Sequence, residues 1–396
     1  MSQPPVFLNE LGIVCALGHS PTAVAAALFA SEAPGGVAAT ALHTPGRPLP
    51  LGAVEGPMAE LSDCALPFRS RNNALLRMAL QQIRPATDAA IQRHGAHRVA
   101  VIIGTSTSGI AEPERAMPFL QANGAWPSDF HYAQSEMGAP SRFVALQSGA
   151  RGPAWTISTA CSSSAKALAS AARLLRAGVV DAVIAGGADS LCAFTINGFS
   201  ALESVSATRC NPFSRNRDGI NIGEGAALFL VTREAGPVRL AGWGESSDAH
   251  HMSAPEPEGR GAIDAITQAL VRAGIRPDEV GYVNLHGTAT PQNDAMESRA
   301  VWATLGARVP ASSTKPLTGH ALGAAGAIEA GLCWLTLARN PAGHLPPHWW
   351  DGVADPELPA LEFVAPGTRL SGPLRYALSN SFAFGGSNAA LLLGAG

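Results

Sequence analysis

Hydrophobic residues in this chain form short continuous runs that alternate with longer stretches of small and apolar residues. The runs at 98–103, 181–185 and 227–231 are almost entirely apolar. Such runs are typical of strands that are covered on both faces of a sheet. Helical stretches rich in alanine and leucine separate them, and the pattern therefore predicts an α/β fold.

The same order of elements occurs twice along the chain. Residues 157–178 and 311–338 each show a strand end, a turn and a helix of small residues, and strands at 181–187 and 375–381 follow them. A repeated unit of this kind predicts a pseudo-twofold structure, in which equivalent loops of the two halves converge on one site. We place the boundary so that the halves are 1–238 and 239–396.

Composition narrows the class of protein. With 46% hydrophobic and 14% charged residues among 396, much of the chain must be buried. A net charge of −3 gives no general attraction to nucleic acid or to a membrane surface. The six cysteines show no C-x-x-C or zinc spacing, and neither a signal peptide nor a membrane-spanning run stands out. We expect a soluble cytoplasmic protein with reduced thiols.

Cys161 is the first candidate for chemistry. It lies in Thr159–Ser164, between a short strand at 154–157 and a helix at 165–177. The unpaired N–H groups and the dipole at a helix N-terminus favour the thiolate, which is the nucleophilic form. A nucleophilic Cys161 would carry out acyl chemistry through a thioester. If Cys161 is considered without the rest of the sequence, the alternative to a nucleophile is a structural cysteine that packs in a tight strand–helix contact.

Three segments of the second half supply matching chemistry. His286 ends a strand and is followed by a glycine and two threonines, Lys315 and His320 precede the second small-residue helix, and 380–388 is a glycine-containing turn between apolar strands. Each is a weak signal alone. Together they supply an activated thiol, donors for a developing enolate and an oxyanion hole, the set that decarboxylative carbon–carbon bond formation needs.

From these residues the chain resembles the elongating β-ketoacyl-acyl-carrier-protein synthases, condensing enzymes of the thiolase superfamily, from about Val6 to Leu393. The motifs that carry the resemblance are Thr159–Ser164, Asn211–Gly219, Gly223–Gly225, His286–Thr290, Ser313–His320 and Phe384–Asn388. The resemblance implies a thiolase-like five-layered αβαβα fold, a dimer, and condensation of a Cys-bound acyl chain with malonyl-acyl carrier protein to give 3-oxoacyl-acyl carrier protein. It implies no metal and no cofactor, because the carrier protein brings the phosphopantetheine.

The resemblance also implies roles for particular residues. Cys161 would take the acyl chain, and His286 and His320 would promote malonyl decarboxylation and stabilise the enolate, with the identity of the base left open. Lys315 would orient the site electrostatically. Glu329, on the following helix, is its expected salt-bridge partner.

Further positions concern the oxyanion hole and the substrate. The N–H groups of Cys161 and Phe384 would form the oxyanion hole, and Phe384 matches the family's gating phenylalanine. Thr288 and Thr290 would bind the phosphopantetheine arm. Phe199 falls where the family lines its acyl pocket, with ordinary core packing as an equal alternative.

Two departures from the family pattern bear on specificity. Thr107 stands where housekeeping enzymes often carry a bulkier apolar residue, which suggests a roomier or more polar pocket for a longer, unsaturated or aryl-primed chain. Glu203 stands where a basic contact to the carrier protein often occurs. Docking would then depend on Arg69, Arg71 and Arg77, unless these arginines belong to an ordinary exposed helix face.

Other functions remain as alternatives. A thiolase acting on coenzyme A esters would carry a second cysteine near the C-terminus, but no cysteine follows Cys333. A non-catalytic chain-length partner would lack the nucleophile, so this chain is expected to be the active one in either a homodimer or a heterodimer with a related chain. Chain length, saturation and pathway, whether fatty acid or specialised polyketide or polyene, stay open.

Overall fold

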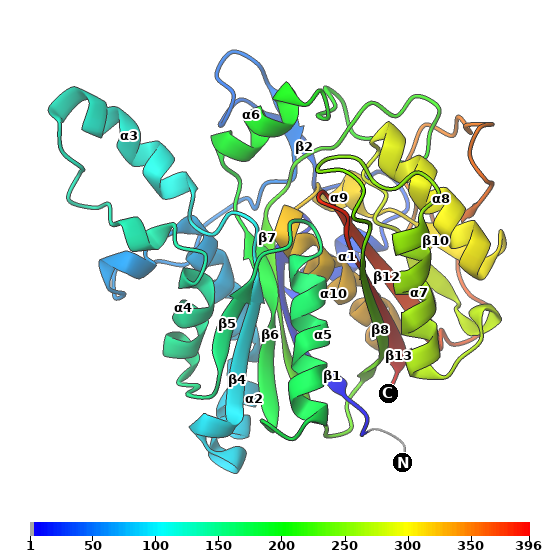
Figure 1. Cartoon of the computed structure of the whole chain (residues 1–396), viewed down its shortest axis with the longest axis horizontal. Coiled ribbons are helices and arrows are strands. Elements are labelled where there is room, and N and C mark those ends of the chain that lie inside the picture. Colours follow the sequence, from blue (N-terminus) through cyan, green and yellow to red (C-terminus); the bar gives the residue numbers. More distant parts are fainter. Residues whose placement is uncertain (1–3) are drawn as a thin grey trace.

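One 11-stranded sheet forms the frame of the molecule (Figure 1), and it consists of two parts, called the first and second sheets below, with the same strand order. The computed structural model describes residues 4–396. The first sheet runs β5-β4-β6-β7-β1 and the second β10-β9-β12-β13-β8. The strands of the first are β1 Phe7–Cys15, β4 Val99–Gly104, β5 Ala154–Ile157, β6 Ala182–Asp189 and β7 Gly225–Thr232. Those of the second are β8 Val238–Ser247, β9 Tyr282–Asn284, β10 Pro310–Ser312, β12 Tyr376–Ala383 and β13 Ser387–Ala395. Short strands are β2 Ala38–Thr40, β3 Leu49–Leu51 and β11 Glu362–Phe363, which extends the second sheet beside β10.

Strand directions confirm the duplication. In the first sheet β4 is parallel to β5 and β6, whereas β7 is antiparallel to β6 and β1. In the second, β9 is parallel to β10 and β12, whereas β13 is antiparallel to β12 and β8. Phe7 and Leu8 of β1 pair with Arg239 and Val238 of β8 and so join the sheets. The division of the chain after residue 238 stays a prediction.

Helices complete five layers, as expected. The α-helices are α1 Pro21–Leu28, α2 Arg71–His94, α3 Ala111–Asn123, α4 Ala139–Ser148, α5 Ser163–Arg176, α6 Ala193–Ala201, α7 Arg260–Ala273, α8 Pro291–Leu305, α9 Lys315–Thr318 and α10 Ala325–Ala338. Short 3-10 turns lie at Leu66–Phe68, Ala96–Arg98, Tyr132–Gln134, Pro277–Glu279 and Leu322–Ala324. α5 and α10 contact both sheets and form the middle layer, α2 covers the outer face of the first sheet, and α7 packs on the outer face of the second with α8 beside it (Figure 1).

The two central helices pack closely because their facing residues are small. α10 is buried on every side from Ala325 to Thr336, which accounts for a sequence that is apolar all round. A Cβ at Gly326 would lie 2.9 Å from the backbone nitrogen of Ala165 in α5, too close for any side chain. This approach brings the loops before α5 and α10 together, and Cys161 and His320 become neighbours.

Between residues 4 and 396, no helix has both the length and the apolar character needed to cross a bilayer.

Candidate active site

The predicted nucleophile lies in a tight turn between β5 and α5. Ser162 is the N-cap of α5, so Cys161 directly precedes the helix. Ala160 has φ of 50°, a left-handed conformation that is uncommon for a residue other than glycine. The Ser163 hydroxyl accepts from the Thr159 N–H at 2.9 Å and donates to the Ala160 carbonyl at 2.6 Å. These contacts hold the turn that directs the thiol into the interior.

Burial opposes ionisation of the Cys161 thiol. Burial raises its pKa to about 12, and the Lys315 charge and the backbone N–H of Phe384 only partly oppose that effect. Desolvation thus opposes the effect of the helix N-terminus, which is expected to favour the thiolate. His320 Nε2 lies 3.0 Å from Sγ and can accept the proton.

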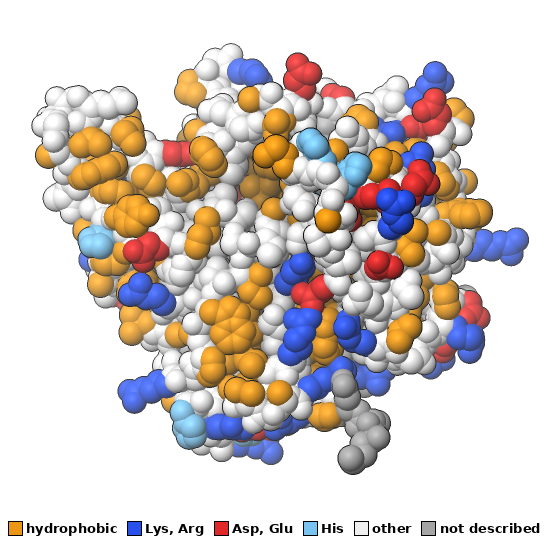
Figure 2. All heavy atoms as spheres, in the orientation of Figure 1, with side chains coloured by type: hydrophobic (Ala, Val, Ile, Leu, Met, Phe, Trp, Pro, Cys, Tyr) orange, Lys and Arg blue, Asp and Glu red, His pale blue; other side chains and the backbone are white. Residues whose placement is uncertain are grey.

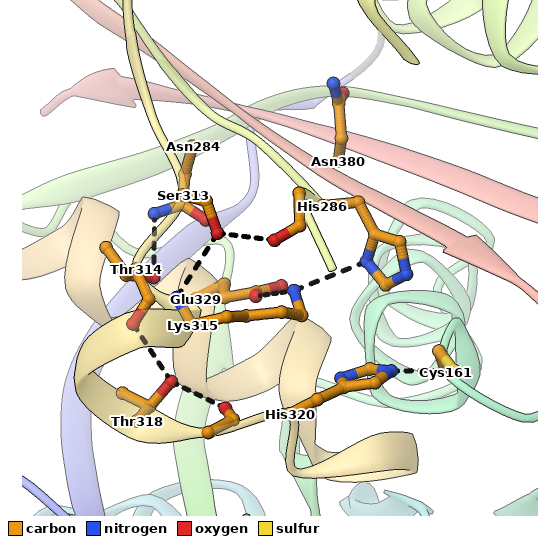
Figure 3. A network of polar contacts seen from close by, with 12 residues as sticks. Cys161, Asn284, His286, Ser313, Thr314, Lys315, Thr318, His320, Glu329 and Asn380 are labelled. Carbon is orange, nitrogen blue, oxygen red and sulfur yellow. Dashed lines mark hydrogen bonds and ion pairs between the residues drawn. The ribbon is translucent and has the colours of Figure 1, made fainter. Parts of the chain in front are cut away.

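Two histidines from the second half face the thiol (Figure 3). His286 follows β9, and His320 lies between α9 and the Leu322–Ala324 turn. Their rings are nearly perpendicular, with centroids 5.2 Å apart. Burial and the nearby Lys315 charge lower the pKa of both imidazoles well below the ordinary value of 6.5. Both are neutral at neutral pH and can each offer one N–H.

Lys315 orients His286. Its ammonium is buried, forms an ion pair with Glu329 of α10, and donates to His286 Nδ1 at 3.5 Å. An ammonium has no acceptor, so His286 Nδ1 accepts and the ring carries its hydrogen on Nε2. The structure thus brings together Lys315 and Glu329, the pair expected from sequence (Figure 3).

Glu297 of α8 was not recognised from sequence. Its carboxylate accepts from the backbone N–H groups of His286 at 2.8 Å and Gly287 at 2.7 Å, and from Asn380 Nδ2 at 3.1 Å. It is fully buried, and burial raises its pKa to about 7. The only sequence signal is an acidic residue eleven positions after His286 in a helix that starts beside the strand end. Glu297 holds the turn that carries His286.

Replacing Glu297 with glutamine should therefore misplace His286. Glutamine offers one carbonyl oxygen to two N–H donors, and the turn would lose about one charge-assisted hydrogen bond. We expect kcat of condensation to fall about tenfold or more, with little change in KM, measured in a steady-state assay. Glu362→Gln on the exposed β11 is the matched control and should retain full activity. An unchanged kcat in Glu297→Gln would contradict the positioning role.

Asp189, at the end of β6, is a second residue that sequence reasoning missed. Its buried carboxylate accepts from the N–H groups of Ser106, Thr107 and Gly323 at 2.6–3.0 Å. Gly323 belongs to the turn between His320 and α10. One carboxylate therefore joins the two halves of the molecule directly beside the site.

Predicted substrate-binding residues line one pocket with the thiol and both histidines. The pocket has a volume of about 380 Å³. Thr288 and Thr290 lie on its wall with hydroxyls 3.0 Å apart, and Phe199 contacts Phe384 with ring centroids 5.5 Å apart. Its lining also includes Leu202, Glu203, Ile220, Pro255 and Asn293.

Thr107 is absent from that lining. It is buried, and its hydroxyl and N–H are both used by Asp189, at 2.8 and 3.0 Å. The Thr107 side chain thus supports the neighbouring loop, and its effect on the width of the pocket stays a prediction.

The three arginines predicted to dock the carrier protein are engaged within the chain. Arg71 is ion-paired with the buried Glu224, and Arg77 lies 2.7 Å from Asp63 with its side chain only 12% exposed. These contacts give Arg71 and Arg77 structural roles within the chain, and their part in docking is still a prediction. Arg69 is exposed, although its guanidinium also donates to the carbonyls of Ser62 and Cys64, and its docking role stays a prediction.

Cys161, His286 and His320 are residue types that can bind a metal ion. Their ligand atoms lie within 4.8 Å of one another. The Lys315 ammonium, 3.5 Å from His286 Nδ1, would repel a cation there. A buried thiol beside a neutral imidazole, with a second imidazole held by an ammonium, instead defines an enzyme that forms a thioester on cysteine.

Comparison with known proteins agrees with an enzyme of this class, one that forms a thioester on cysteine. The family described as beta-ketoacyl synthase matches with its N-terminal domain over residues 70–236 and its C-terminal domain over residues 238–348. A 3-oxoacyl-[acyl-carrier-protein] synthase 2 from Synechocystis is 34% identical, with 79% of each chain covered. The one from Coxiella burnetii is 31% identical, with 99% of each chain covered.

A solved structure provides a further match. A chain from the ketosynthase ApeO in complex with its chain length factor ApeC, from Xenorhabdus doucetiae, is 47% identical with a TM-score of 0.90. That match covers 99% of this chain and 98% of the other. The chain therefore belongs to the β-ketoacyl synthase family.

Proposed function

We propose that this chain catalyses decarboxylative Claisen condensation of a Cys161-bound acyl group with malonyl-acyl carrier protein. The observation that carries the proposal is the contact of 3.0 Å between Cys161 Sγ and His320 Nε2, in a pocket that His286 shares. The product is 3-oxoacyl-acyl carrier protein, two carbons longer than the acyl group that entered.

In the first half-reaction Cys161 takes the acyl group from its carrier. His320 Nε2 accepts the thiol proton as Sγ attacks the thioester carbonyl. The negative charge on the carbonyl oxygen is met by the N–H groups of Cys161 and Phe384. The carrier's phosphopantetheine thiolate then leaves and takes the proton from His320, so the imidazole is neutral again.

In the second half-reaction the malonyl group loses carbon dioxide. The Nε2–H of His286, held in that tautomer by Lys315, donates to the malonyl thioester oxygen as the enolate forms. The enolate carbon attacks the acyl carbon on Cys161, and the Cys161 sulfur leaves as thiolate. Neutral imidazoles suit this step because they donate hydrogen bonds without a prior proton transfer.

The same site needs no bound cofactor in this proposal. The phosphopantetheine arrives attached to the carrier protein, and Thr288 and Thr290 on the pocket wall are placed to bind its amides. All six cysteines have free thiols, which supports work in a reducing cytoplasm.

We further propose that the chain is the catalytic half of a dimer with a related ketosynthase-like chain. The support is the 47% identity to a chain from a ketosynthase–chain length factor complex. β5 ends its sheet with a partly exposed, unpaired edge. Hydrophobic side chains also gather over α3 on the left of Figure 2, and Met117 and Phe119 of this helix are exposed. Met117 lines a groove together with the exposed Phe194 of α6. An apolar patch and a free sheet edge both suit a protein partner.

The test uses malonyl-carrier protein with carbon-13 in the free carboxyl group. The chain is assayed with an acyl-carrier protein, alone and with a co-purified ketosynthase-like partner. We expect all the label to leave as carbon dioxide and the product mass to rise by one two-carbon unit. Retained label, or equal condensation with an acetyl-coenzyme A ester, would contradict the proposal and indicate a thiolase. Activity of the chain alone that equals activity with the partner would contradict the heterodimer.

A further inference from the structure

Lysine is rare in this chain. All but two of its 27 basic residues are arginines, and the exceptions are Lys166 and Lys315. Lys315 belongs to the active site. Lys166 lies on α5, five residues after Cys161, and no step of the proposed reaction uses it. An ammonium is a compact donor on a flexible stem, whereas a guanidinium is a wide planar group. The use of lysine rather than arginine at position 166 therefore indicates a site that needs a compact cation.

The Lys166 ammonium contacts the end of the turn that carries Phe384. We call Ala383–Ser387 the gating turn; it connects β12 to β13. Lys166 Nζ donates to Ser387 Oγ at 2.6 Å. The Ser162 hydroxyl, one residue after Cys161, donates to the same oxygen at 3.1 Å. A single hydroxyl thus ties one end of the gating turn to the start of α5 by two contacts.

Loss of the contact between the Lys166 ammonium and Ser387 Oγ would be unfavourable because of burial. Lys166 is half-buried, and its ammonium donates a hydrogen bond to Ser387. Burial and the like charge of Arg173 lower its pKa. A partly desolvated ammonium that loses its acceptor is destabilised by more than an ordinary neutral group. The chain therefore favours conformations in which Ser387 stays at α5.

The gating turn is also held from its other side. Gly385 N–H donates to the Met252 carbonyl at 2.9 Å, and Asp248 N–H donates to the Gly386 carbonyl at 2.8 Å. Gly385 and Gly386 have φ of 84° and 73°, a region that favours glycine. The turn is thus held in its middle by the 248–252 segment and at its Ser387 end by α5.

We propose that Lys166 is a positioning residue that holds the gating turn against α5, so that the Phe384 N–H stays directed at the Cys161 sulfur. This inference rests on the proposed function and deepens it. Movement of Phe384 is then confined to residues 383–386, and the oxyanion hole re-forms in the same place after each opening.

The test compares Lys166→Met, Lys166→Arg, Ser387→Ala and the double variant Lys166→Met/Ser387→Ala with the native chain. Arg173→Met, two turns along the same helix, is the matched control. Amide hydrogen exchange of residues 383–388 measures the turn without any substrate. Intact-mass kinetics of Cys161 acylation, as kcat and KM, measure its effect on the reaction.

We expect Lys166→Met to raise exchange in the turn about tenfold or more and to slow acylation by a similar factor, with KM unchanged. Ser387→Ala should act in the same direction, the double variant should be no worse than Lys166→Met, and arginine should not rescue. Arg173→Met should change neither quantity. Native-like exchange and acylation in Lys166→Met, or additive effects of the two substitutions, would overturn the proposal.

If the proposed condensation is not the function of the chain, the result differs from the one that would overturn the role of Lys166. The native chain would then show no acylation of Cys161, yet exchange in the variants would still decide the role of Lys166. Should Lys166→Met not fold, Ser387→Ala tests the same contact while keeping the ammonium.

Discussion

Replacing Cys161 with alanine is expected to abolish formation of the acyl-enzyme and to reduce condensation by at least about a thousandfold. The variant loses the thiol that contacts the histidine pair. The histidines themselves remain, so slow release of carbon dioxide from malonyl-carrier protein should persist. Intact-mass analysis after incubation with acyl-carrier proteins measures the adduct directly, and an acyl series shows which chains are accepted.

Cys64→Ala is the matched control for this experiment. Cys64 is also buried, but it contacts Arg77 and Asp63 far along the sequence from the site and lines no part of its pocket. The control should acquire the acyl group at the native rate. An adduct that persists in Cys161→Ala would refute the assignment of the nucleophile.

Replacing Lys315 with methionine should damage both stability and catalysis. Glu329 would be left as an unpaired buried carboxylate, and breaking such a pair costs about 3–5 kcal/mol of unfolding free energy. His286 would also lose the donor that sets its tautomer, so condensation should fall more than acylation. Thermal melts and separate measurements of the two half-reactions test this expectation.

The stability of Lys315→Met should depend on pH in a defined direction. Burial already raises the pKa of Glu329, and loss of the Lys315 charge raises it further. The folded state then binds a proton that the unfolded state has released, so stability falls as pH rises from the unfolded pKa through the raised folded pKa. We expect the variant to be less stable at about pH 8 than at about pH 5.5.

A second substitution tests whether the unpaired Glu329 carboxylate causes the loss of stability and its pH dependence. Lys315→Met/Glu329→Gln carries no buried charge and should recover part of the lost stability and lose the pH dependence, without recovering activity. A Lys315→Met variant whose melting temperature is equally reduced at both pH values would contradict the role assigned to Glu329.

Local patterns were enough to predict much of this site. The strand at 154–157, the helix that follows Cys161 and the repeat of that unit at 311–338 are all present, because each depends on neighbours in sequence. The predicted second helix is shorter than expected: a 3-10 turn precedes α10, which starts at Ala325.

Long-range contacts account for what the patterns missed. Glu297 and Asp189 are isolated acidic residues in sequence, and only the packing of α8 and β6 brings them against the turns they hold. Thr107, Arg71 and Arg77 are expected to meet substrate or carrier protein, and they also have partners 82, 153 and 14 positions away along the chain. No local pattern reports such a partner.

The sequence by itself determined the repeated α/β fold and the set of groups available for chemistry, since apolar periodicity and motif residues are local properties. Only the tertiary structure decided how those groups behave. The protonation state of Cys161, the neutral histidines and the tautomer of His286 depend on burial and on the Lys315 charge, both of which arise when α5 and α10 pack between the two sheets. Electrostatic free energies depend on distance and on solvent exclusion, and neither exists before the chain has folded.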